Sequence, residues 1–326
     1  MNSLVAAAKK EGTLNVIALP PTWANYGTII NTFEKKYGIT VNSTLPDGTS
    51  QQEVDAVKSE NGSPKAPDVL DIGMAVALAN TSLFAPYEVS SWSAIPAAQK
   101  APNGIWVQDY GGYMAIGYEA KFGTITSLSQ LLSSKFKGAV ALNGNPTSAN
   151  AGLNGVMMAN LAEGGTAGDI SKGVNFFHQL KAAGNFNPVS ATGATIKAGS
   201  TPVVFNWDYL NLPSYVGVSG WKVFVPQGVA LGGYYAQAIN KAAPHPAAAR
   251  LWEEFLYSQA TDGGQNLWLD GGARPVEQQA MASNNSINSS AASKLPSVTG
   301  TPVFLTQTQS TQAADYLAAN WAKAIG

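Results

Sequence analysis

The sequence predicts an α/β fold, in which a series of short strands and helices begins twice along the chain. Short buried strands alternate with amphipathic helices over residues 1–72, which is typical of a mainly parallel sheet covered on both faces. The strand–helix series begins again after Tyr118. With 326 residues, the chain is long enough for one large or two medium domains.

The individual elements follow from apolar periodicity and from turn residues. Gly12 and Gly38 end the first two helices, and Ser127 is a candidate cap for a short one. The segment 281–294, rich in serine, asparagine and alanine, is predicted to lie on the surface. Predicted strands cover residues 14–19, 39–42, 68–72, 105–118, 139–142, 186–189, 203–206, 221–225 and 234–240. Predicted helices cover residues 3–11, 28–37, 53–60, 127–133, 149–162, 170–183, 247–258, 262–268 and 309–324.

The chain carries few charges, which excludes several classes of function. Charged residues make up 12% of the sequence, against a usual share of about a quarter, and the net charge is −1. Lysine and arginine do not cluster, so a nucleic-acid-binding face is not expected. No segment reaches the ~20 consecutive apolar residues that a membrane span requires.

Catalysis and metal binding are not expected either. The sequence has no cysteine, which removes disulfides, thiolate metal sites and cysteine nucleophiles. Its two histidines, His178 and His245, lie in a helix-like run and in a proline-flanked turn, so a histidine-based triad or metal site is not indicated. No Walker loop or dinucleotide fingerprint occurs. We therefore predict a protein that is not an enzyme and that uses no cofactor and no metal.

The most informative stretch is Thr201–Tyr209, a short buried strand that ends in Trp207, Asp208 and Tyr209. Ligands of open α/β sheets bind beyond the carboxyl ends of strands, so these three side chains are predicted to line a pocket. Flat aromatic faces beside a fixed negative charge suit an ammonium group or another small organic cation. In the alternative interpretation, the aromatic rings belong to the core and Asp208 caps the following helix.

The order of segments resembles that of the type II periplasmic solute-binding proteins of ABC importers. The nearest branch holds the binders of ferric ion, thiamine, polyamines, 2-aminoethylphosphonate and 4-aminobutyrate. The resemblance covers nearly the whole chain and depends on the order of several segments. These are Glu11–Val16, Pro67–Ile72, Leu83–Tyr87, Asp109–Tyr118, Thr201–Tyr209 and Gly232–Asn240.

The resemblance implies a two-lobed periplasmic-binding-protein-like fold, in which each lobe is a mixed sheet flanked by helices. Lobe 1 would comprise residues 1–115 plus 241–326, and lobe 2 residues 116–240. Asp109–Tyr118 and Gly232–Asn240 would be the two hinge strands, with the ligand cleft between the lobes. Closure of the lobes would trap the ligand.

Further candidate ligand-binding residues come from loops that such a fold brings to the cleft. Trp23 and Tyr26 are expected to stack on a ligand, Asn25 to bond to it, and Gly73 to expose backbone amides. Thr147 and Ser148 open a helix whose free amides and dipole favour an anion, although ordinary N-capping explains them too. The remaining candidates are Tyr110 beside the ammonium group, Tyr234 in the return hinge, and Arg274, whose guanidinium suits a carboxylate or phosphonate.

Iron is disfavoured by one departure from the ferric-ion binders, which carry adjacent iron-ligating tyrosines. Here the corresponding pair is Asp208-Tyr209, and the doublet Tyr234-Tyr235 lies in a strand, where alternation turns the rings to opposite faces. The charges instead favour a zwitterionic amine such as 4-aminobutyrate or an aminoalkylphosphonate. A polyamine such as putrescine or spermidine is the first alternative, and ferric ion and thiamine are further ones.

The same resemblance gives the expected partners and location. The protein would be a monomer that delivers its solute to the membrane permease of an ABC importer, in the periplasm or outside the cell, free or lipid-anchored. The chain enters an amphipathic helix directly after Met1, so we expect a leader peptide that is not part of this sequence. A ligand-sensing domain, or an enzyme on the same fold, are the alternative classes.

Overall fold

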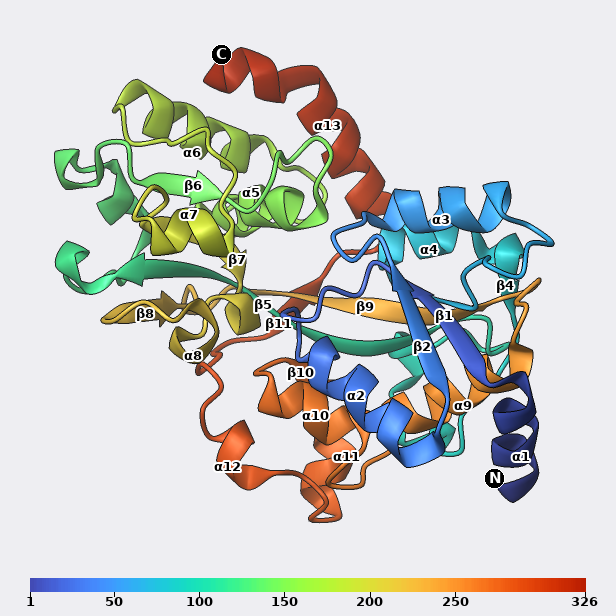
Figure 1. Cartoon of the computed structure of the whole chain (residues 1–326). Helices are drawn as coiled ribbons and strands as arrows, with labels where there is room; N and C mark the ends of the chain where they lie inside the picture. The colour runs from blue at the N-terminus through green and yellow to red at the C-terminus, as the bar shows by residue number, and fades with distance from the viewer. The chain divides into compact units, whose positions relative to one another are not determined.

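A computed structural model of the chain divides into two compact units (Figure 1). Unit 1 comprises Met1–Gly111 and Tyr234–Lys294, and unit 2 comprises Gly112–Gly233 and Leu295–Gly326. The structure describes residues 1–212 and 215–326 with their side chains, and the side chains of residues 213 and 214 lie outside this description. The strands β5 (Val107–Glu119) and β9 (Ala230–Asn240) each run from one unit into the other.

Unit 1 is built from short strands and from helices that mostly begin and end where the sequence predicts. Its own strands are β1 (Thr13–Ile17), β2 (Thr40–Thr44), β3 (Val69–Gly73), β4 (Phe84–Ala85) and β10 (Arg274–Pro275). Its helices are α1 (Asn2–Glu11), α2 (Tyr26–Tyr37), α3 (Ser50–Ser59), α4 (Met74–Ala79), α9 (Pro246–Leu256), α10 (Gly264–Asp270), α11 (Gln278–Ser283) and α12 (Ser289–Ala292). Its 3₁₀ turns are η1 (Thr81–Leu83), η2 (Trp92–Ala94) and η3 (Ala97–Gln99).

Unit 2 repeats the α/β plan with the second half of β5. Its own strands are β6 (Val140–Leu142), β7 (Val203–Trp207), β8 (Trp221–Phe224) and β11 (Pro302–Phe304). Its helices are α5 (Asn150–Ala162), α6 (Ser171–Ala182), α7 (Gly193–Lys197), α8 (Pro213–Val216) and α13 (Gln307–Ile325). Its 3₁₀ turns are η4 (Ala120–Phe122), η5 (Leu128–Leu132), η6 (Ser134–Phe136) and η7 (Asp208–Leu210).

The sheets are mixed, so the prediction of a mainly parallel sheet is wrong. In unit 1, β1 and β2 pair in parallel, whereas β3 and β4 both run antiparallel to β9. In unit 2, β6 and β7 are parallel, and β7 and β8 are antiparallel to β5. Strand–helix alternation predicts parallel pairing, but it gives no information on the direction of the long strands β5 and β9. Both run antiparallel to most of the strands beside them.

Local signals fixed most helix ends. Gly12 and Gly38 close α1 and α2 with φ of 74° and 67°, a left-handed conformation that glycine adopts without steric cost. Helix α3 starts three residues before its predicted beginning, because Thr49 and Gln52 form a capping box. Ser127 does cap the short helix, which is a 3₁₀ turn.

Two local predictions are wrong. Residues 186–189 form no strand, since only Phe186 bridges to Val140, and Pro188 lacks the amide that a ladder needs. Helix α5 is capped by Ala149, so neither Thr147 nor Ser148 caps it. The segment 281–294 lies mostly on the surface, as predicted, although α11 and α12 bury Met281 and Ala291.

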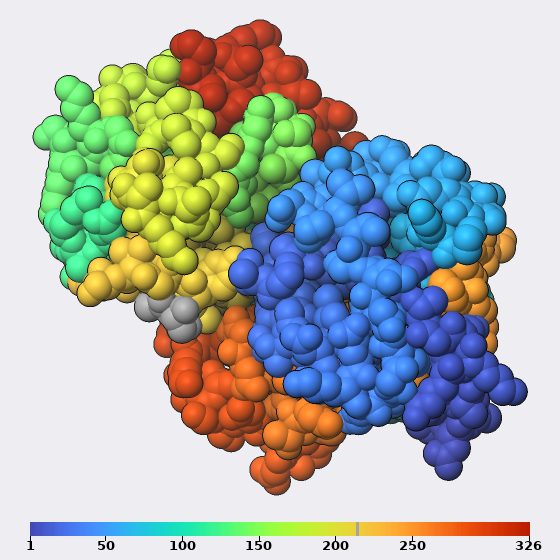
Figure 2. Space-filling model, in the orientation of Figure 1, coloured from blue at the N-terminus to red at the C-terminus, as the bar shows by residue number. Residues whose placement is uncertain are grey.

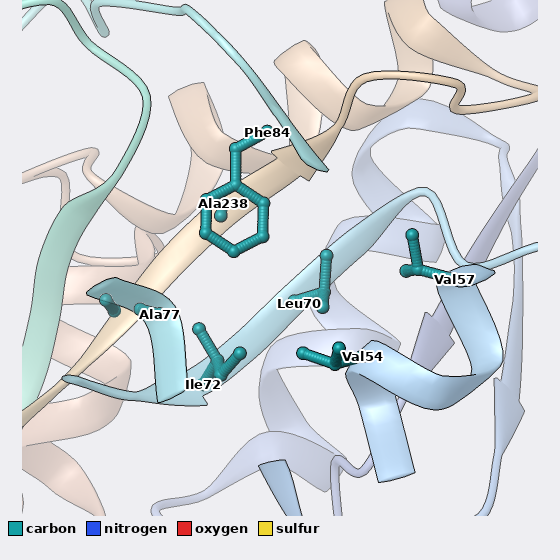
Figure 3. Packing of buried hydrophobic residues seen from close by; sticks show 8 residues of the cluster. Val54, Val57, Leu70, Ile72, Ala77, Phe84 and Ala238 are labelled. Atoms are coloured by element: carbon teal, nitrogen blue, oxygen red, sulfur yellow. The ribbon is translucent and has the colours of Figure 1, made fainter. Parts of the chain in front are cut away.

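The core of unit 1 includes a cluster between α3, β3 and β9. Figure 3 shows Val54 and Val57 of α3 directed at Leu70 and Ile72 of β3. Ala238 of β9 and the neighbouring Phe84 complete the packing. The exposed fractions of all these side chains do not exceed 4%. Burial of such side chains stabilises a fold by about 1.5–3 kcal/mol each, so this cluster fixes β9 beside β3.

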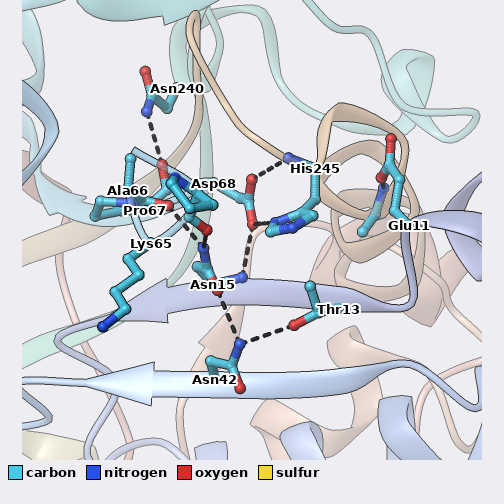
Figure 4. Close-up of polar contacts among 12 residues, drawn as sticks. Glu11, Thr13, Asn15, Asn42, Lys65, Ala66, Pro67, Asp68, Asn240 and His245 are labelled. Carbon is cyan, nitrogen blue, oxygen red and sulfur yellow. Dashed lines mark hydrogen bonds and ion pairs between the residues drawn. The ribbon is translucent and has the colours of Figure 1, made fainter. Parts of the chain in front are cut away.

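The polar side chain of Asp68 joins the amino end of β3 to β1 and to α9. Its carboxylate accepts the backbone N–H of Asn15 at 2.7 Å, the backbone N–H of His245 at 2.7 Å and the ring Nδ1–H of His245 at 2.9 Å (Figure 4). Glu11 adds a further link, because its carboxylate accepts the N–H groups of Ala247 and Ala248 at the start of α9.

The C-terminal segment groups with unit 2. Helix α13 lies on α5 and α6 (Figure 2), where the ring of Trp321 meets that of Phe177 at a centroid distance of 5.5 Å. Residues 241–326 were all predicted to belong to lobe 1, and the observed grouping departs from that assignment after Lys294. Among the residues that the structure describes, no helix has the length and apolar character to cross a membrane.

Candidate functional site

In unit 1, three aromatic side chains from distant segments meet and form what we call the aromatic face: Trp23, Tyr110 and Tyr235. Trp23 follows β1, in a turn closed by hydrogen bonds from Trp23 N–H to Pro20 O and from Tyr26 N–H to Trp23 O. The rings of Tyr110 and Tyr235 are stacked, with centroids 5.7 Å apart and planes 16° apart. Trp23 meets Tyr235 edge-on, at 6.1 Å and 89°.

The polar groups of the aromatic face are connected to a buried carboxylate. Trp23 Nε1–H donates to Tyr110 Oη at 2.7 Å, and Tyr110 Oη–H donates to Asp71 Oδ2 at 3.1 Å. Tyr26 Oη–H donates to the same Asp71 oxygen at 2.7 Å. Each of these donors has a single hydrogen, so the hydroxyl hydrogens of Tyr26 and Tyr110 point at Asp71 and the indole hydrogen of Trp23 points at Tyr110 Oη. The carboxyl of Asp71 therefore lies beneath the aromatic face, and Tyr110 is only 1% exposed because its ring packs against those of Tyr235 and Trp268.

Asp71 belongs to a group of buried acids, Glu53, Asp71 and Asp109, which we call the acid cluster. Their exposed fractions are 1%, 7% and 0%. Glu53 Oε2 accepts the backbone N–H of Asp71 at 3.1 Å, and Asp109 Oδ2 accepts Gln237 Nε2–H at 2.9 Å. Gln237 also donates to Tyr26 Oη at 3.2 Å, which joins both sides of the cluster.

Burial governs the ionisation of the acid cluster. Loss of water raises the pKa of Asp71 to about 7, although hydrogen bonds from Tyr26 and Tyr110 act in the opposite direction. Burial, and then the charge of Asp71, raise the pKa values of both Asp109 and Glu53 well above the ordinary range. Burial likewise raises the pKa of Tyr26, so its hydroxyl stays protonated and remains a donor.

The other predicted residues of unit 1 have structural contacts in addition to any role in binding. Asn25, with φ of 67°, donates from Nδ2 to Leu267 O at 2.8 Å and so ties the loop to α10. The amide of Gly73 donates to Ser50 Oγ at 2.9 Å. Arg274 lies in β10, opposite Gly111 of β5, and is half-buried. Tyr234 is half-buried in β9.

In unit 2, the predicted residues Trp207, Asp208 and Tyr209 are buried, with exposed fractions of 1%, 0% and 1%. Asp208 Oδ1 accepts the backbone N–H groups of Tyr113 and Tyr209, each at 3.0 Å. The backbone of β5 approaches so closely that a Cβ at Gly112 would lie 2.1 Å from that oxygen. This carboxylate therefore fixes the end of β7 against β5, and its contact with a ligand stays a prediction.

Trp207 has an unsatisfied donor. Its ring covers Gly233, where a Cβ would lie 2.4 Å from Cη2, and its buried Nε1–H has no hydrogen-bond partner among the side chains that the structure describes. Thr147 and Ser148 are exposed in the turn before α5, and both bond to Asn145.

Sequence reasoning missed Tyr235, Gln237 and Asp109 as members of the site. A signal was present for two of them, because Tyr235 and Gln237 are two residues apart on one strand and share a face. Asp71 was not among the predicted contacts either. Among the residues with described side chains, no group of three His, Cys, Asp or Glu residues is arranged to hold a metal ion.

Comparisons with known proteins bear on the class of this site. The family model described as "Bacterial extracellular solute-binding protein" matches residues 63–298. No curated protein matches the chain.

Three solved structures share the fold at low sequence identity. Apo ferric ion-binding protein A of Pasteurella haemolytica is 19% identical, with 97% of this chain and 99% of that chain covered and a TM-score of 0.69. An ABC transporter substrate-binding protein of Bradyrhizobium japonicum USDA 110 is 17% identical, with 97% and 100% covered and a TM-score of 0.68. The periplasmic binding protein AfuA of Actinobacillus pleuropneumoniae, with exogenous fructose-6-phosphate bound, is 16% identical, with 95% and 97% covered and a TM-score of 0.67. These likenesses confirm the type II periplasmic-binding-protein-like fold.

Proposed function

This chain belongs to the bacterial extracellular solute-binding proteins, the substrate-binding components of ABC transporters, and we propose that it captures a small solute with a positively charged amine. The observation that carries the proposal is the chain of hydrogen bonds that leads from the aromatic face to the buried carboxyl of Asp71. Trp23 Nε1–H donates to Tyr110 Oη, and Tyr110 Oη–H donates to Asp71. Trp23 and Tyr235 are half-buried and are the rings that we propose to contact the ligand, whereas Tyr110, which is 1% exposed, supports them from beneath. Ring faces attract cations, and the attraction increases where water is excluded.

A zwitterionic ω-amino acid or aminoalkylphosphonate fits the distribution of charge best. The ammonium group would stack on the aromatic face, and Arg274 of β10 would bind the carboxylate or phosphonate through its guanidinium. Asn25, Tyr26, Gly73 and Tyr234 of unit 1 are the remaining proposed contacts on that side.

Unit 2 supplies the other proposed contacts. They are Thr147, Ser148, Trp207, Asp208 and Tyr209, of which Trp207 offers an unsatisfied indole N–H. We propose that the ligand is captured when the two units, in the role of the lobes, close about β5 and β9 and that a membrane permease then receives it. The protein would act as a monomer in the periplasm or outside the cell, free or lipid-anchored, without enzymatic activity.

A thermal-shift screen tests the ligand class. We expect 4-aminobutyrate, 2-aminoethylphosphonate or a polyamine to raise the melting temperature, because a ligand that binds only the native state stabilises it by mass action. Butyrate, which lacks the amine, is the matched control and should have no effect. If only ferric ion, thiamine or fructose-6-phosphate raises the melting temperature, the proposal is wrong.

A pair of tryptophan variants tests the site. Trp23→Ala should weaken binding of the best amine roughly 5- to 30-fold, since a partly desolvated cation–π contact contributes about 1–2 kcal/mol. Trp92→Ala is the control, because Trp92 is also half-buried in unit 1 but packs under Lys100, whose Nζ lies 4.8 Å from the ring centroid. If the two variants bind the amine with equal affinity, the aromatic face is not part of the binding site.

A further inference from the structure

Lysines gather at one end of unit 2. Unit 2 contains eight lysines and five acidic residues, whereas unit 1 contains eleven basic and fifteen acidic ones. Six of the eight lysines border the same edge of the sheet of unit 2, and we call this surface the lysine end. Its members, all exposed, are Lys121, Lys135, Lys137, Lys181, Lys197 and Lys222.

Strand register defines that edge of the sheet. Tyr118 of β5 lies opposite Val203 of β7, and Val203 lies beside Val140 of β6. Glu119, the last residue of β5, lies opposite Trp221, the first residue of β8 (Figure 1). Strand β5 therefore ends where β6, β7 and β8 begin, and the proposed ligand contacts of β7 lie at its other end.

Four of the lysines adjoin the ends of these strands. Lys121 follows β5, Lys137 precedes β6, and Lys222 is the second residue of β8. Lys135 lies beside the turn that follows β5, since a Cβ on Gly123 would lie 3.5 Å from Lys135 Nζ. These four side chains come from three separate segments of the chain.

The other two lysines end helices that stop at the same edge. Lys181 is in the last turn of α6, and the segment after this helix reaches the start of β6, where the N–H of Gly138 donates to Gly184 O at 2.8 Å. Lys197 ends α7, and a Cβ on Gly217, in the loop that leads to β8, would lie 3.8 Å from Lys197 Cε. The six lysines are scattered along the sequence, so only the fold gathers them.

Local structure accounts for half of these positive charges. Lys121 Nζ forms an ion pair with Glu119 Oε2 at 2.7 Å. Lys181 and Lys197 lie in last helical turns, where a cation interacts favourably with the carbonyl end of the helix.

The remaining three lysines have no such explanation. Among the residues with described side chains, Lys135, Lys137 and Lys222 form no ion pair. In the sequence, Glu119 is the only acidic residue of the segments 117–139, 178–203 and 215–224, which surround the lysine end. The surface thus presents six positive charges against one negative charge, in a chain whose charged residues make up only 12%.

An aromatic ring lies among these lysines. Phe122 is half-buried, and its ring stacks on that of Phe136 at a centroid distance of 5.0 Å. Lys121 Nζ lies 5.4 Å from the centroid of Phe122. Exposed lysines around an apolar ring suit a membrane surface, where cations meet headgroups and rings meet the acyl boundary.

We propose that the lysine end of unit 2 binds the anionic headgroups of phospholipids at a membrane surface. The chain belongs to the bacterial extracellular solute-binding proteins of ABC transporters, which work beside the membrane that holds the transporter. Each lysine near an anionic membrane strengthens binding roughly fivefold, so several lysines together give measurable association. This surface is separate from the proposed amine site and does not depend on it.

Co-sedimentation of the whole protein with lipid vesicles tests the proposal. The probe is vesicles of phosphatidylcholine that contain about one third phosphatidylglycerol, at an ionic strength of about 0.1 M. We expect binding to these vesicles and at least roughly tenfold weaker binding to pure phosphatidylcholine. At about 1 M salt, where the screening length falls to about 3 Å, the binding should be lost.

A pair of double variants tests the position of the surface. Lys135→Gln together with Lys137→Gln should weaken binding to the phosphatidylglycerol vesicles roughly 25-fold. Lys9→Gln together with Lys10→Gln is the control, because it makes the same change in net charge at exposed positions of α1 in unit 1. The control should bind within about twofold of the wild type.

Three outcomes would overturn the proposal. They are equal binding to both kinds of vesicle, equal weakening by the two double variants, and displacement from the vesicles by double-stranded DNA at equal charge concentration, which would show a surface for any polyanion. The lipid and salt comparisons use the wild-type protein, so they decide the question even if a variant is unstable. Failure of every amine to bind would refute the proposed function and leave this test unchanged.

Discussion

Asp68 and His245 are bonded to each other twice: the backbone N–H of His245 donates to Asp68 Oδ1 at 2.7 Å, and its ring Nδ1–H donates to Asp68 Oδ2 at 2.9 Å. The same Oδ2 accepts the N–H of Asn15 at 2.7 Å. One fully buried carboxylate thus connects β3, β1 and the start of α9, three segments that are far apart in the sequence. This contact stabilises the part of unit 1 that supports the aromatic face.

Asp68→Asn is expected to destabilise the protein by about 2–4 kcal/mol, because one carboxylate oxygen becomes an amide that faces N–H donors. Urea unfolding followed by circular dichroism measures the change. Asp47→Asn is the control, since Asp47 is exposed, and it should stay within about 0.5 kcal/mol of the wild type. Equal midpoints for the two variants would show that Asp68 contributes nothing.

Gly112→Ala should disturb the junction where β5 leaves unit 1. The added Cβ would lie 2.1 Å from Asp208 Oδ1 and 2.7 Å from Tyr209 Cδ1, so the buried Asp208 side chain must move. We expect a loss of stability of about 1–3 kcal/mol. Gly193→Ala is the control in the same unit, because its Cβ meets no atom within 4 Å. A Gly112→Ala protein as stable as the control would contradict this packing.

Tyr26→Phe removes the shorter of the two tyrosine hydrogen bonds to Asp71. A hydrogen bond to a buried charged group contributes about 1.5–3 kcal/mol, so the free energy of unfolding at pH 8 should fall by that amount. The effect should be smaller at pH 5, where Asp71 is protonated. Tyr37→Phe is the control, since Tyr37 is a half-buried tyrosine of the same helix whose hydroxyl has no hydrogen-bond partner among the described residues. Equal losses of unfolding free energy at pH 5 and pH 8 would show that the strength of this hydrogen bond does not depend on the charge of Asp71.

The free energy of unfolding should decrease as the pH rises from about 4 to 8. Burial raises the pKa of Asp71 from 3.8 to about 7 and that of Glu253 from 4.5 to about 8. The folded protein therefore holds protons that the unfolded chain has released, so this stabilisation is complete below pH ~4 and lost above the folded pKa values.

Each of these two acids should contribute about 2–4 kcal/mol to that change. Urea titrations at pH 5, 6.5 and 8 measure it, and Glu253→Gln should flatten the curve. A stability that increases steadily with pH over this range would refute the assignment of buried protonated acids.

Several elements could be predicted from sequence because their signals are local. The apolar period of residues 28–37 and the glycine that follows were enough to define α2, whose side chains Tyr26 and Phe33 are buried. Trp23 and Tyr110 were singled out as aromatic residues in loop and crossing positions, and they do meet. Sequence gave no corresponding signal for the partners of Asp71, because the residues around it come from α2, α3, β5 and β9.

The amino-acid sequence by itself determined the α/β class, the helix ends and the two crossing strands, since periodicity and turn residues act over a few neighbouring positions. Only the tertiary structure decided the antiparallel pairing of β3 with β9 and the gathering of Asp71, Asp109 and Gln237 under Tyr110. Strand pairing and shared burial depend on which distant segments exclude water together, and the energy of a buried acid depends on that whole environment. No short stretch of residues contains that information.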